Sequence, residues 1–375
     1  MQRRTIAPRR DWQAKVEALG LVWHTAGGQP YWNEAAYYSV SMREVEEIER
    51  ATATLYDLML KAGQAIIDRG LWARFAIPDW CAPLIAAAWE AEPPCLNHGR
   101  FDLAYDGHGP PKLLEFNCDT PTALFEAAVV QWLWKEDVKP RADQFNSLHE
   151  KLIAKWADIR PYLPPLVHFT HMADPAGEDV VTVAYLRDTA REAGIVSEGI
   201  LIQDIGWDGR RFLDLQDRPI GALFKLYPWE WLAREAFGRN IAAAEPMLWI
   251  EPIWKMMLSN KAVLPLLWEL NPGHPNLLPA SFEPLRGDQV KKPILGREGA
   301  NISVIRGGRT VAETRGDYGA EGFVYQQYAA LPDFGGLRPV VGSWVVDGEP
   351  AGMGIREDGL ITGNLARFVP HAIEA

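Results

Sequence analysis

Residues 100–122 read Arg100-Phe-Asp102-Leu-Ala-Tyr-Asp-Gly-His-Gly-Pro-Pro-Lys-Leu-Leu-Glu115-Phe-Asn117-Cys-Asp-Thr-Pro-Thr122. Glycines and prolines at the centre of this stretch mark a turn, and a short run of alternating polar and apolar residues lies on each side of it. Alternate side chains of a strand point to opposite faces of a sheet. The stretch therefore predicts a β-hairpin with one polar and one apolar face.

The polar face combines residue types that bind phosphates and metals. It carries a guanidinium and a carboxylate from the first strand, and a carboxylate and a carboxamide from the second. Such oxygen ligands suit Mg²⁺, and an arginine beside them suits a phosphate or a carboxylate. Polar alternation also describes a solvated amphipathic ribbon, and this stretch alone favours that reading. The four polar residues are Arg100, Asp102, Glu115 and Asn117, and those expected to point away are Phe101, Leu103, Leu114, Phe116 and Cys118.

Composition indicates an ordinary globular protein. The chain has 375 residues, of which 48% are hydrophobic and 23% charged, and three widely spaced cysteines that form no metal-binding pattern. No secretory signal or bilayer-spanning apolar run is evident, so we expect a soluble, cytoplasmic protein. The net charge of −11 argues against nucleic-acid binding, although an acidic surface attracts cationic substrates such as polyamines.

The order of predicted elements divides the chain into parts. A long helix over 41–69 is capped by Ser41, and further helices are expected near 82–91, 123–135 and 143–158. A proline-rich linker at 161–165 precedes a small α/β unit with a parallel sheet, which extends to about residue 250. Its strands are expected at 166–170, 180–184, 198–203 and 222–226, with a helix at 186–193. Helices follow 253, and short strands with glycine turns follow 290.

Three segments of the second half are candidates for nucleotide binding. Lys291-Lys292-Pro-Ile-Leu-Gly-Arg297 leads into a glycine-bounded loop, where backbone amides can approach phosphates, although it is not a Walker loop. The strand at 322–328 ends in polar residues that could face an adenine. Arg356 lies in a later strand–turn–strand. Taken alone, each segment is at least as well explained by an ordinary hairpin or buried strand.

Six motifs in order give a specific resemblance to the glutathionylspermidine synthase family, and most closely to its stand-alone synthetase members. The similarity covers almost the whole chain. The motifs are Arg100-Phe-Asp102, Glu115-Phe-Asn117, Ser259-Asn-Lys261, the 291–297 stretch, Tyr325-Gln-Gln327, and Gly354-Ile-Arg-Glu-Asp358 with Ile361-Thr-Gly363.

The resemblance implies an ATP-grasp ligase that joins a carboxylate to an amine through an acyl phosphate, with ATP and Mg²⁺ as cofactors. It implies that Arg100 is catalytic and contacts substrate, and that Asp102, Glu115 and Asn117 bind the metal. Thr120, Thr122 and Arg356 match substrate-binding positions. The expected ATP-binding residues are Lys261, Lys292, Gly299, Ala300, Gln326, Gln327, Ile361, Thr362 and Gly363.

The implied fold class is α+β or α/β, an ATP-grasp fold in which the metal ligands precede the lysines, the permuted order of this family. A small α/β unit resembling a pre-ATP-grasp domain is inserted at 161–252. It separates residues 1–160, which hold the helices and the hairpin, from the nucleotide-binding part at 253–375. We expect no amidase activity, because 375 residues leave no room for the amidase half of bifunctional members.

The resemblance leaves the substrates open. A peptide or amino-acid carboxylate and a polyamine or other amine fit the family, while the oligomeric state is unknown. We expect loop 296–301 to act as a lid that excludes water from the acyl phosphate. An ATP-grasp phosphotransferase that forms no amide, and a non-catalytic nucleotide-binding relative, are the alternatives.

Overall fold

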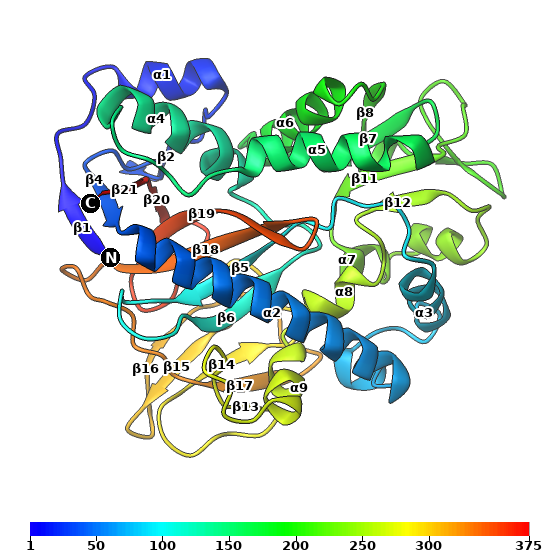
Figure 1. Cartoon of the computed structure of the whole chain (residues 1–375). Helices are drawn as coiled ribbons and strands as arrows, with labels where there is room; N and C mark the ends of the chain where they lie inside the picture. The colour runs from blue at the N-terminus through cyan, green and yellow to red at the C-terminus, as the bar shows by residue number, and fades with distance from the viewer. Residues whose placement is uncertain (375) are drawn as a thin grey trace.

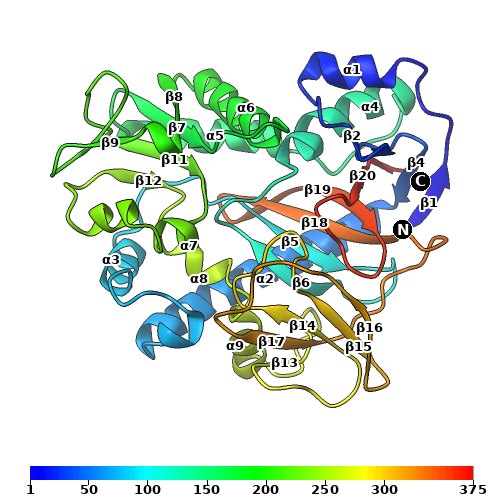
Figure 2. The same ribbon diagram turned by 180° about the vertical axis from the view of Figure 1, so that it is seen from behind.

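The computed structural model describes residues 1–374 and arranges their strands in six sheets. Two five-stranded antiparallel sheets lie one above the other at the centre of the view, and a four-stranded parallel sheet lies to one side (Figures 1 and 2). This mixed α/β architecture confirms the fold class at that level. None of the helices in residues 1–374 combines the length and apolar character needed to cross a bilayer.

The central sheet joins the hairpin to strands from the far end of the chain. The register pairs Asp102 with Gly342 and Gly342 with Gly354, so segments about 240 residues apart become neighbours. All adjacent strands are antiparallel. The order is β20 (Arg367–Val369), β19 (Glu349–Asp358), β18 (Arg338–Val346), β5 (Gly99–Ala104) and β6 (Lys112–Asn117).

Helix α2 (Met42–Asp68) covers the outer face of this sheet (Figure 1). It begins at a capping box, in which the Ser41 hydroxyl accepts from the Glu44 amide and the Glu44 carboxylate accepts from the Ser41 amide. Apolar residues at helical spacing, including Val45, Ile48 and Leu55, are buried against the sheet. The helix predicted over 41–69 is therefore confirmed.

The second five-stranded sheet lies across from the hairpin and carries the lysine-rich strand. Helix α9 (Val263–Leu270) packs against its edge, and α8 (Lys255–Leu258) packs against α2. The strand order is β13 (Ala280–Ser281), β17 (Phe323–Gln327), β14 (Gln289–Pro293), β15 (Ser303–Arg306) and β16 (Arg309–Glu313).

The parallel sheet forms the small α/β unit expected after residue 161. Its order is β12 (Leu248–Ile250), β11 (Ala222–Leu226), β7 (Val167–His171) and β8 (Ser197–Leu201), and α5 (Leu148–Ile159) packs on α6 (Glu178–Glu192). The strand predicted at 180–184 is wrong, because these residues belong to α6. Val180 and its β-branched neighbours favour a strand locally, but the helix buries Val183 and Leu186.

A three-stranded sheet brings the two ends of the chain together (Figure 1). In it β4 (Ala36–Val40) lies between β1 (Gln2–Thr5) and β21 (His371–Ile373). The helix expected near 123–135 begins at residue 124 and contains a π-helical turn (Glu126–Val130) before α4. The remaining α-helices and strands are α1 (Trp12–Leu19), α3 (Ala82–Ala91), α4 (Gln131–Val138), α7 (Trp229–Leu232), β2 (Thr25–Ala26), β3 (Gln29–Pro30), β9 (Gly206–Trp207) and β10 (Phe212–Leu213).

Candidate functional site

The hairpin of β5 and β6 collects its polar side chains on one face, as the alternation predicts. Arg100 lies opposite Asn117, and Asp102 lies opposite Glu115. Arg100 and Asp102 are each only 5% exposed. The alternative of a solvated ribbon is therefore wrong, because such a ribbon would leave these charges in water.

The apolar face differs from the expectation at one residue. The rings of Phe101 and Phe116 stack with their centroids 3.9 Å apart, as predicted for this face. A bulge in the pairing at Leu103 then places Leu113 in the core, while Leu114 lines a cavity instead of pointing away. A bulge adds a residue to one strand and so shifts the alternation locally, which the residue pattern did not reveal.

Two arginines hold the carboxylate of Asp102. Arg100 donates from Nε to Oδ1 at 2.7 Å and from Nη2 to Oδ2 at 3.2 Å, and Arg356 of β19 donates to Oδ2 at 2.6 Å. Arg100 Nη1 also donates to the carbonyl of Thr122. Gly342 gives the Arg100 stem its space, since a Cβ there would lie 2.8 Å from Cδ. Arg100 is thus fixed in one orientation.

Glu115 is paired with Lys261, whose Nζ lies 3.0 Å from its Oε2, and accepts from Asn117 at 3.1 Å. Burial opposes ionisation of this carboxyl, but the charges of Lys261 and Lys292 outweigh burial and hold its pKa well below the usual value. Lys261 also donates to the carbonyl of Gly296 at 2.6 Å. The base of loop 296–301 is thereby tied to the hairpin.

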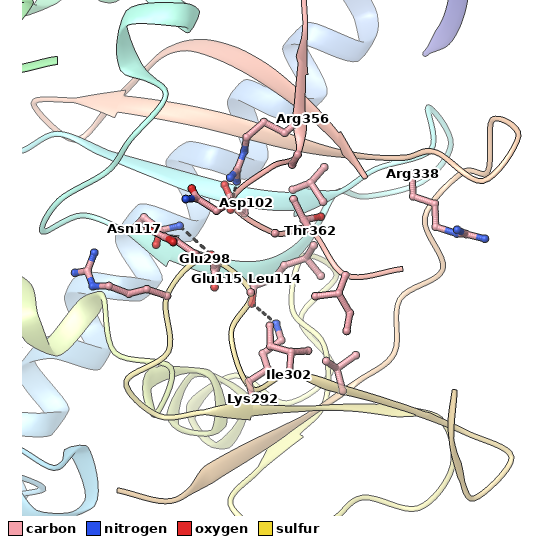
Figure 3. A pocket seen from close by; sticks show the side chains of 18 of the residues that line it. Asp102, Leu114, Glu115, Asn117, Lys292, Glu298, Ile302, Arg338, Arg356 and Thr362 are labelled. Carbon is pink, nitrogen blue, oxygen red and sulfur yellow. Dashed lines mark hydrogen bonds and ion pairs between the residues drawn. The ribbon is translucent and has the colours of Figure 1, made fainter. Parts of the chain in front are cut away.

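Lys292 of β14 faces the hairpin from the second sheet (Figure 3). Its Nζ donates to the carbonyl of Leu114 at 2.9 Å and to Oε1 of Gln326 at 2.7 Å. Burial lowers the pKa of Lys292 to about 8. The backbone amide of Gln327 donates to the carbonyl of Pro279, so it is already used within the sheet.

These side chains line one cavity of about 190 Å³ between the two five-stranded sheets. Among the predicted site residues, Lys261 does not line it and instead lies beneath Glu115, while Ala300 lines a second cavity. The residues that do line the first cavity are Arg100, Asp102, Glu115, Asn117, Thr120, Thr122, Lys292, Gly299, Gln326, Gln327, Arg356, Ile361, Thr362 and Gly363.

The second cavity, of about 620 Å³, adjoins the first and shares Thr120, Thr122 and Arg297 with it. It lies between loop 296–301 and the carboxyl ends of two parallel strands, at Met172 and Leu226. Crevices at the carboxyl ends of parallel strands commonly bind ligands. The two threonines therefore stand where the cavities meet.

Loop 296–301 touches the other predicted nucleotide-binding loop. Gly299 has a φ of +70°, and a Cβ on it would lie 2.5 Å from the carbonyl oxygen of Thr362. The hydroxyl of Thr314 donates to the Gly299 carbonyl at 2.5 Å. Only a glycine fits this contact without strain, so Gly299 keeps the two loops in contact beside the first cavity.

The sequence analysis missed an acidic group at one end of the first cavity. Oε1 of the fully buried Glu126 accepts from Tyr31 at 2.7 Å and Trp23 at 3.2 Å, while its Oε2 has no hydrogen-bond partner within residues 1–374. Glu178, at the start of α6, lines the cavity as Tyr31 does. Burial and then the charge of Glu126 raise the pKa of Glu178 to about 8. No local pattern marks these residues, because their contacts are long-range.

The residues present fit the chemistry of a magnesium nucleotide. Two carboxylates and a carboxamide on one strand pair supply the oxygen ligands that Mg²⁺ takes, usually with substrate phosphates completing its coordination. Lysine and arginine cations around them suit the phosphates. A separate group, His168, Glu198 and Asp214, lies in the small α/β unit. Its carboxylates already accept from Arg218, so it is an ion-pair cluster.

Comparison of the whole sequence finds one family. The sequence model described as glutathionylspermidine synthase preATP-grasp matches residues 3–374. A Haemophilus influenzae protein named as an acid–amine ligase is 41% identical over 364 residues, which cover 92% of this chain and 92% of that protein.

Two longer relatives are more distant. Trypanothione synthetase of Crithidia fasciculata is 28% identical and aligns with 82% of this chain and 52% of its own length. The bifunctional glutathionylspermidine synthetase/amidase of Escherichia coli is 27% identical, and the alignment covers 92% of this chain and 61% of that protein. Among solved structures, a glutathione synthetase-like effector from Globodera pallida superposes with a TM-score of 0.57 at 10% identity, over 98% of both chains, which indicates a shared fold.

Proposed function

The chain belongs to the glutathionylspermidine synthase family of acid–amine ligases, and on this premise we propose that it uses ATP to join a peptide or amino-acid carboxylate to a polyamine or another amine. The predicted resemblance and enzyme class are confirmed. The finer proposal depends on one observation above all: the polar face of the hairpin and Lys292 of the second sheet line the same cavity.

We further propose that the two five-stranded sheets form a permuted ATP-grasp core. In this division residues 1–160 supply the hairpin, residues 253–375 supply the nucleotide-binding strands, and residues 161–252 form an inserted unit. The sharing of the central sheet between the first and last parts supports it. The glutathione synthetase-like structural neighbour supports it as well.

The charges divide the cavity into two ends. At one end the cavity is lined by three cations, Arg100, Arg356 and Lys292, and by two carboxylates, Asp102 and Glu115. Lys261 adds a fourth cation beneath Glu115, and this excess favours phosphates and carboxylates at this end. Asp102, Glu115 and Asn117 would hold Mg²⁺, which neutralises phosphate charge when bound. The other end is acidic, and we propose that it binds the amine.

In the proposed reaction the donor carboxylate, held by Arg100, is phosphorylated by ATP, and the amine then displaces phosphate. The Arg100 guanidinium has more N–H groups than its contacts to Asp102 and Thr122 use, so it can donate to a substrate oxygen as well. A bound ammonium favours the ionised form of Glu178, and this carboxylate, whose pKa is raised, can then accept the proton that the ammonium must lose before it attacks.

We propose that the second cavity takes the acyl donor. Side chains of both charges line it: the cations Arg297 and Arg315, and the anions Asp179 and Glu298. A peptide with free amino and carboxyl groups is complementary to such a wall. The hydroxyls of the two threonines at the junction would then lie beside the part of the donor that reacts.

The proposal is tested by ADP release with carboxylate and amine candidates in pairs, with products identified by mass. We expect release to require a carboxylate and an amine together, and the product to be an amide. A phosphorylated product formed with one substrate alone would favour a phosphotransferase. No ADP release with any pair, despite nucleotide binding, would favour a non-catalytic relative.

Nucleotide affinity should depend on pH through Lys292. Its free-protein pKa of about 8 means that above this pH ADP binding requires uptake of a proton. Glu115, Lys261 and Asp102 are the charged groups that act on it. Measured by calorimetry without metal, affinity should be flat below pH 7 and fall by up to about tenfold per unit above pH 8. Lys292→Arg should remove this dependence, whereas a flat wild-type profile to pH 9.5 would contradict the assignment.

Gly299→Ala should impair closure of the loop. The new Cβ meets the Thr362 carbonyl and the left-handed backbone is strained, so we expect kcat to fall and KM for ATP to rise, each by about tenfold, since strain of this kind is on the order of 1–2 kcal/mol. Gly308→Ala is the matched control, because Gly308 has a φ of +74° but a Cβ there would meet no atom of residues 1–374 within 4 Å. Equal effects of the two variants on steady-state kinetics would rule out a role for the contact.

A further inference from the structure

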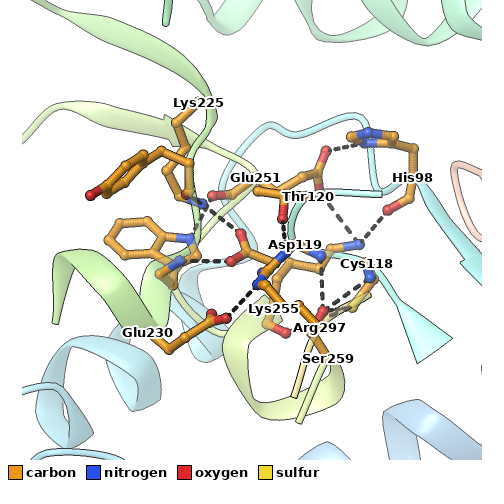
Figure 4. Close-up of polar contacts among 12 residues, drawn as sticks. His98, Cys118, Asp119, Thr120, Lys225, Glu230, Glu251, Lys255, Ser259 and Arg297 are labelled. Atoms are coloured by element: carbon orange, nitrogen blue, oxygen red, sulfur yellow. Dashed lines mark hydrogen bonds and ion pairs between the residues drawn. The ribbon is translucent and has the colours of Figure 1, made fainter. Parts of the chain in front are cut away.

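A fully buried ion pair lies behind the predicted acyl-donor threonines. Lys225 of β11 donates from Nζ to Oδ1 of Asp119, and neither side chain is exposed (Figure 4). The other oxygen, Oδ2, accepts from the backbone amide of Trp229 at 2.7 Å. Lys225 also donates to the carbonyl of Tyr227 at 3.0 Å. Nothing in the proposed chemistry uses this pair directly.

The pair joins two parts of the molecule. Lys225 and Trp229 belong to the small α/β unit, whereas Asp119 follows the end of β6 in the hairpin. The hairpin side is fixed a second time by Ser259, whose hydroxyl accepts from the amides of Cys118 and Asp119 at 3.0 and 2.9 Å. The segment between the metal-binding hairpin and the threonines is therefore held by partners from two directions.

The next residue carries the connection to the loop over the site. Arg297 donates from Nη1 to the hydroxyl of Thr120 at 2.8 Å and from Nε to Glu230 at 2.8 Å (Figure 4). Glu230 lies in α7, beside Trp229. Two cations, Lys225 and Arg297, thus balance two carboxylates, Asp119 and Glu230, around Thr120.

Burial disfavours both charges of the pair. It raises the pKa of Asp119 and lowers the pKa of Lys225, because each is removed from water. Buried ion pairs of this kind contribute little net stability compared with apolar residues of the same size. What such a pair does fix is the relative position of the two segments that carry it, because each charge must meet its partner at one distance and in one direction.

We propose that Asp119 and Lys225 are positioning residues: by locking the end of the hairpin to the small α/β unit, they set the place of Thr120 and, through its hydroxyl, of Arg297. The acyl-donor pocket and the closed loop 296–301 then form together. The inference rests on the proposed function only in naming the ligand of that pocket.

Hydrogen exchange on the protein without substrates tests the geometric part. The double variant Asp119→Asn/Lys225→Met removes both charges and nearly preserves volume. We expect faster exchange in peptides that cover 118–122 and 296–301, with exchange in α2 unchanged. Glu34→Gln is the control, since Glu34 is also buried in an ion pair, with Arg9, but lines neither cavity. Unchanged exchange in both peptides, or the same change in the control, would overturn the proposal.

Kinetics with glutathione and spermidine test whether the effect passes through Thr120. We expect the double variant to raise KM for glutathione at least about tenfold, because a small misplacement near reacting groups is costly. KM for ATP should rise as well, as for Gly299→Ala, because loop 296–301 also lines the first cavity. In a Thr120→Val background the same double substitution should add little.

If the double substitution and Thr120→Val raise KM for glutathione additively, the route through Thr120 is overturned. If conditions that restore the melting temperature of the double variant also restore its KM, the pair is purely structural. If neither the wild type nor the double variant turns over glutathione and spermidine, the proposed function is wrong for these two substrates. The hydrogen-exchange experiment then still decides whether the pair has a positioning role. Asp119→Asn alone keeps an oxygen that can accept from one of the two donors, Lys225 or Trp229, so it replaces the double variant if that protein does not fold.

Discussion

Arg100→Ala should lower kcat about 10²–10³-fold and leave ADP binding nearly unchanged, because loss of one electrostatic contact to a developing charge is worth roughly 3–4 kcal/mol. The guanidinium is fixed by Asp102 and by the Thr122 carbonyl, so its remaining N–H groups point in set directions. Such preorganised donors lose little to rearrangement during the reaction. The measurement is steady-state kinetics beside calorimetry with ADP.

The fold should survive this substitution. Asp102 keeps Arg356 as a cationic partner at 2.6 Å, so no buried carboxylate is left alone. Gly342→Ala offers a second route to the same test, since its Cβ would displace the Arg100 stem without removing the charge. We expect a smaller loss of kcat from Gly342→Ala. Turnover of Arg100→Ala comparable to wild type would refute the catalytic assignment.

The hairpin was predictable from sequence because its information is local. Turn residues and strict alternation fix both the strands and the face shared by Arg100, Asp102, Glu115 and Asn117. The bulge that turns Leu114 into the cavity depends on how β5 pairs within a five-stranded sheet. That pairing involves β18, more than 200 residues away, and leaves no mark near Leu114.

The wrong strand prediction at 180–184 and the unforeseen place of Lys261 have the same origin. A β-branched run at 180–184 favours a strand, yet the residues form a helix because α6 must cover the parallel sheet with Val183 and Leu186. Lys261 was expected to bind ATP, and the structure places it beneath Glu115, where it reaches the loop through Gly296. Its role toward ATP stays a prediction. Tertiary packing decided each case.

Glu126 shows what a single sequence hides. It lies within a stretch of apolar residues read as a plain helix, at 0% exposure. Only the fold reveals that Tyr31, 95 residues earlier, donates to it and that Tyr31 and Glu178 line the first cavity. A buried carboxylate oxygen with no hydrogen-bond partner within residues 1–374 is costly unless a ligand satisfies it.

Glu126→Gln should raise KM for the amine by roughly tenfold, because it removes a carboxylate that lies behind Tyr31 of the first cavity and acts on Glu178. The amide can still accept from Tyr31 and Trp23, so the change preserves packing while it removes a carboxyl whose pKa burial raises. ADP affinity should not change, because we propose that the nucleotide binds at the cationic end. The measurement is KM for spermidine at saturating ATP and glutathione.

The pH profile separates recognition of a cation from a general loss of activity. Burial and the charge of Glu126 raise the pKa of Glu178 to about 8, so in the free protein Glu178 is largely protonated at pH 7. A bound ammonium favours the ionised carboxyl, and amine affinity in the wild type should rise with pH toward 8. Without the charge of Glu126 the pKa of Glu178 falls, and this rise should move to lower pH. If Glu126→Gln changes neither KM for the amine nor the profile, while Glu34→Gln behaves identically, the acidic end does not bind the amine.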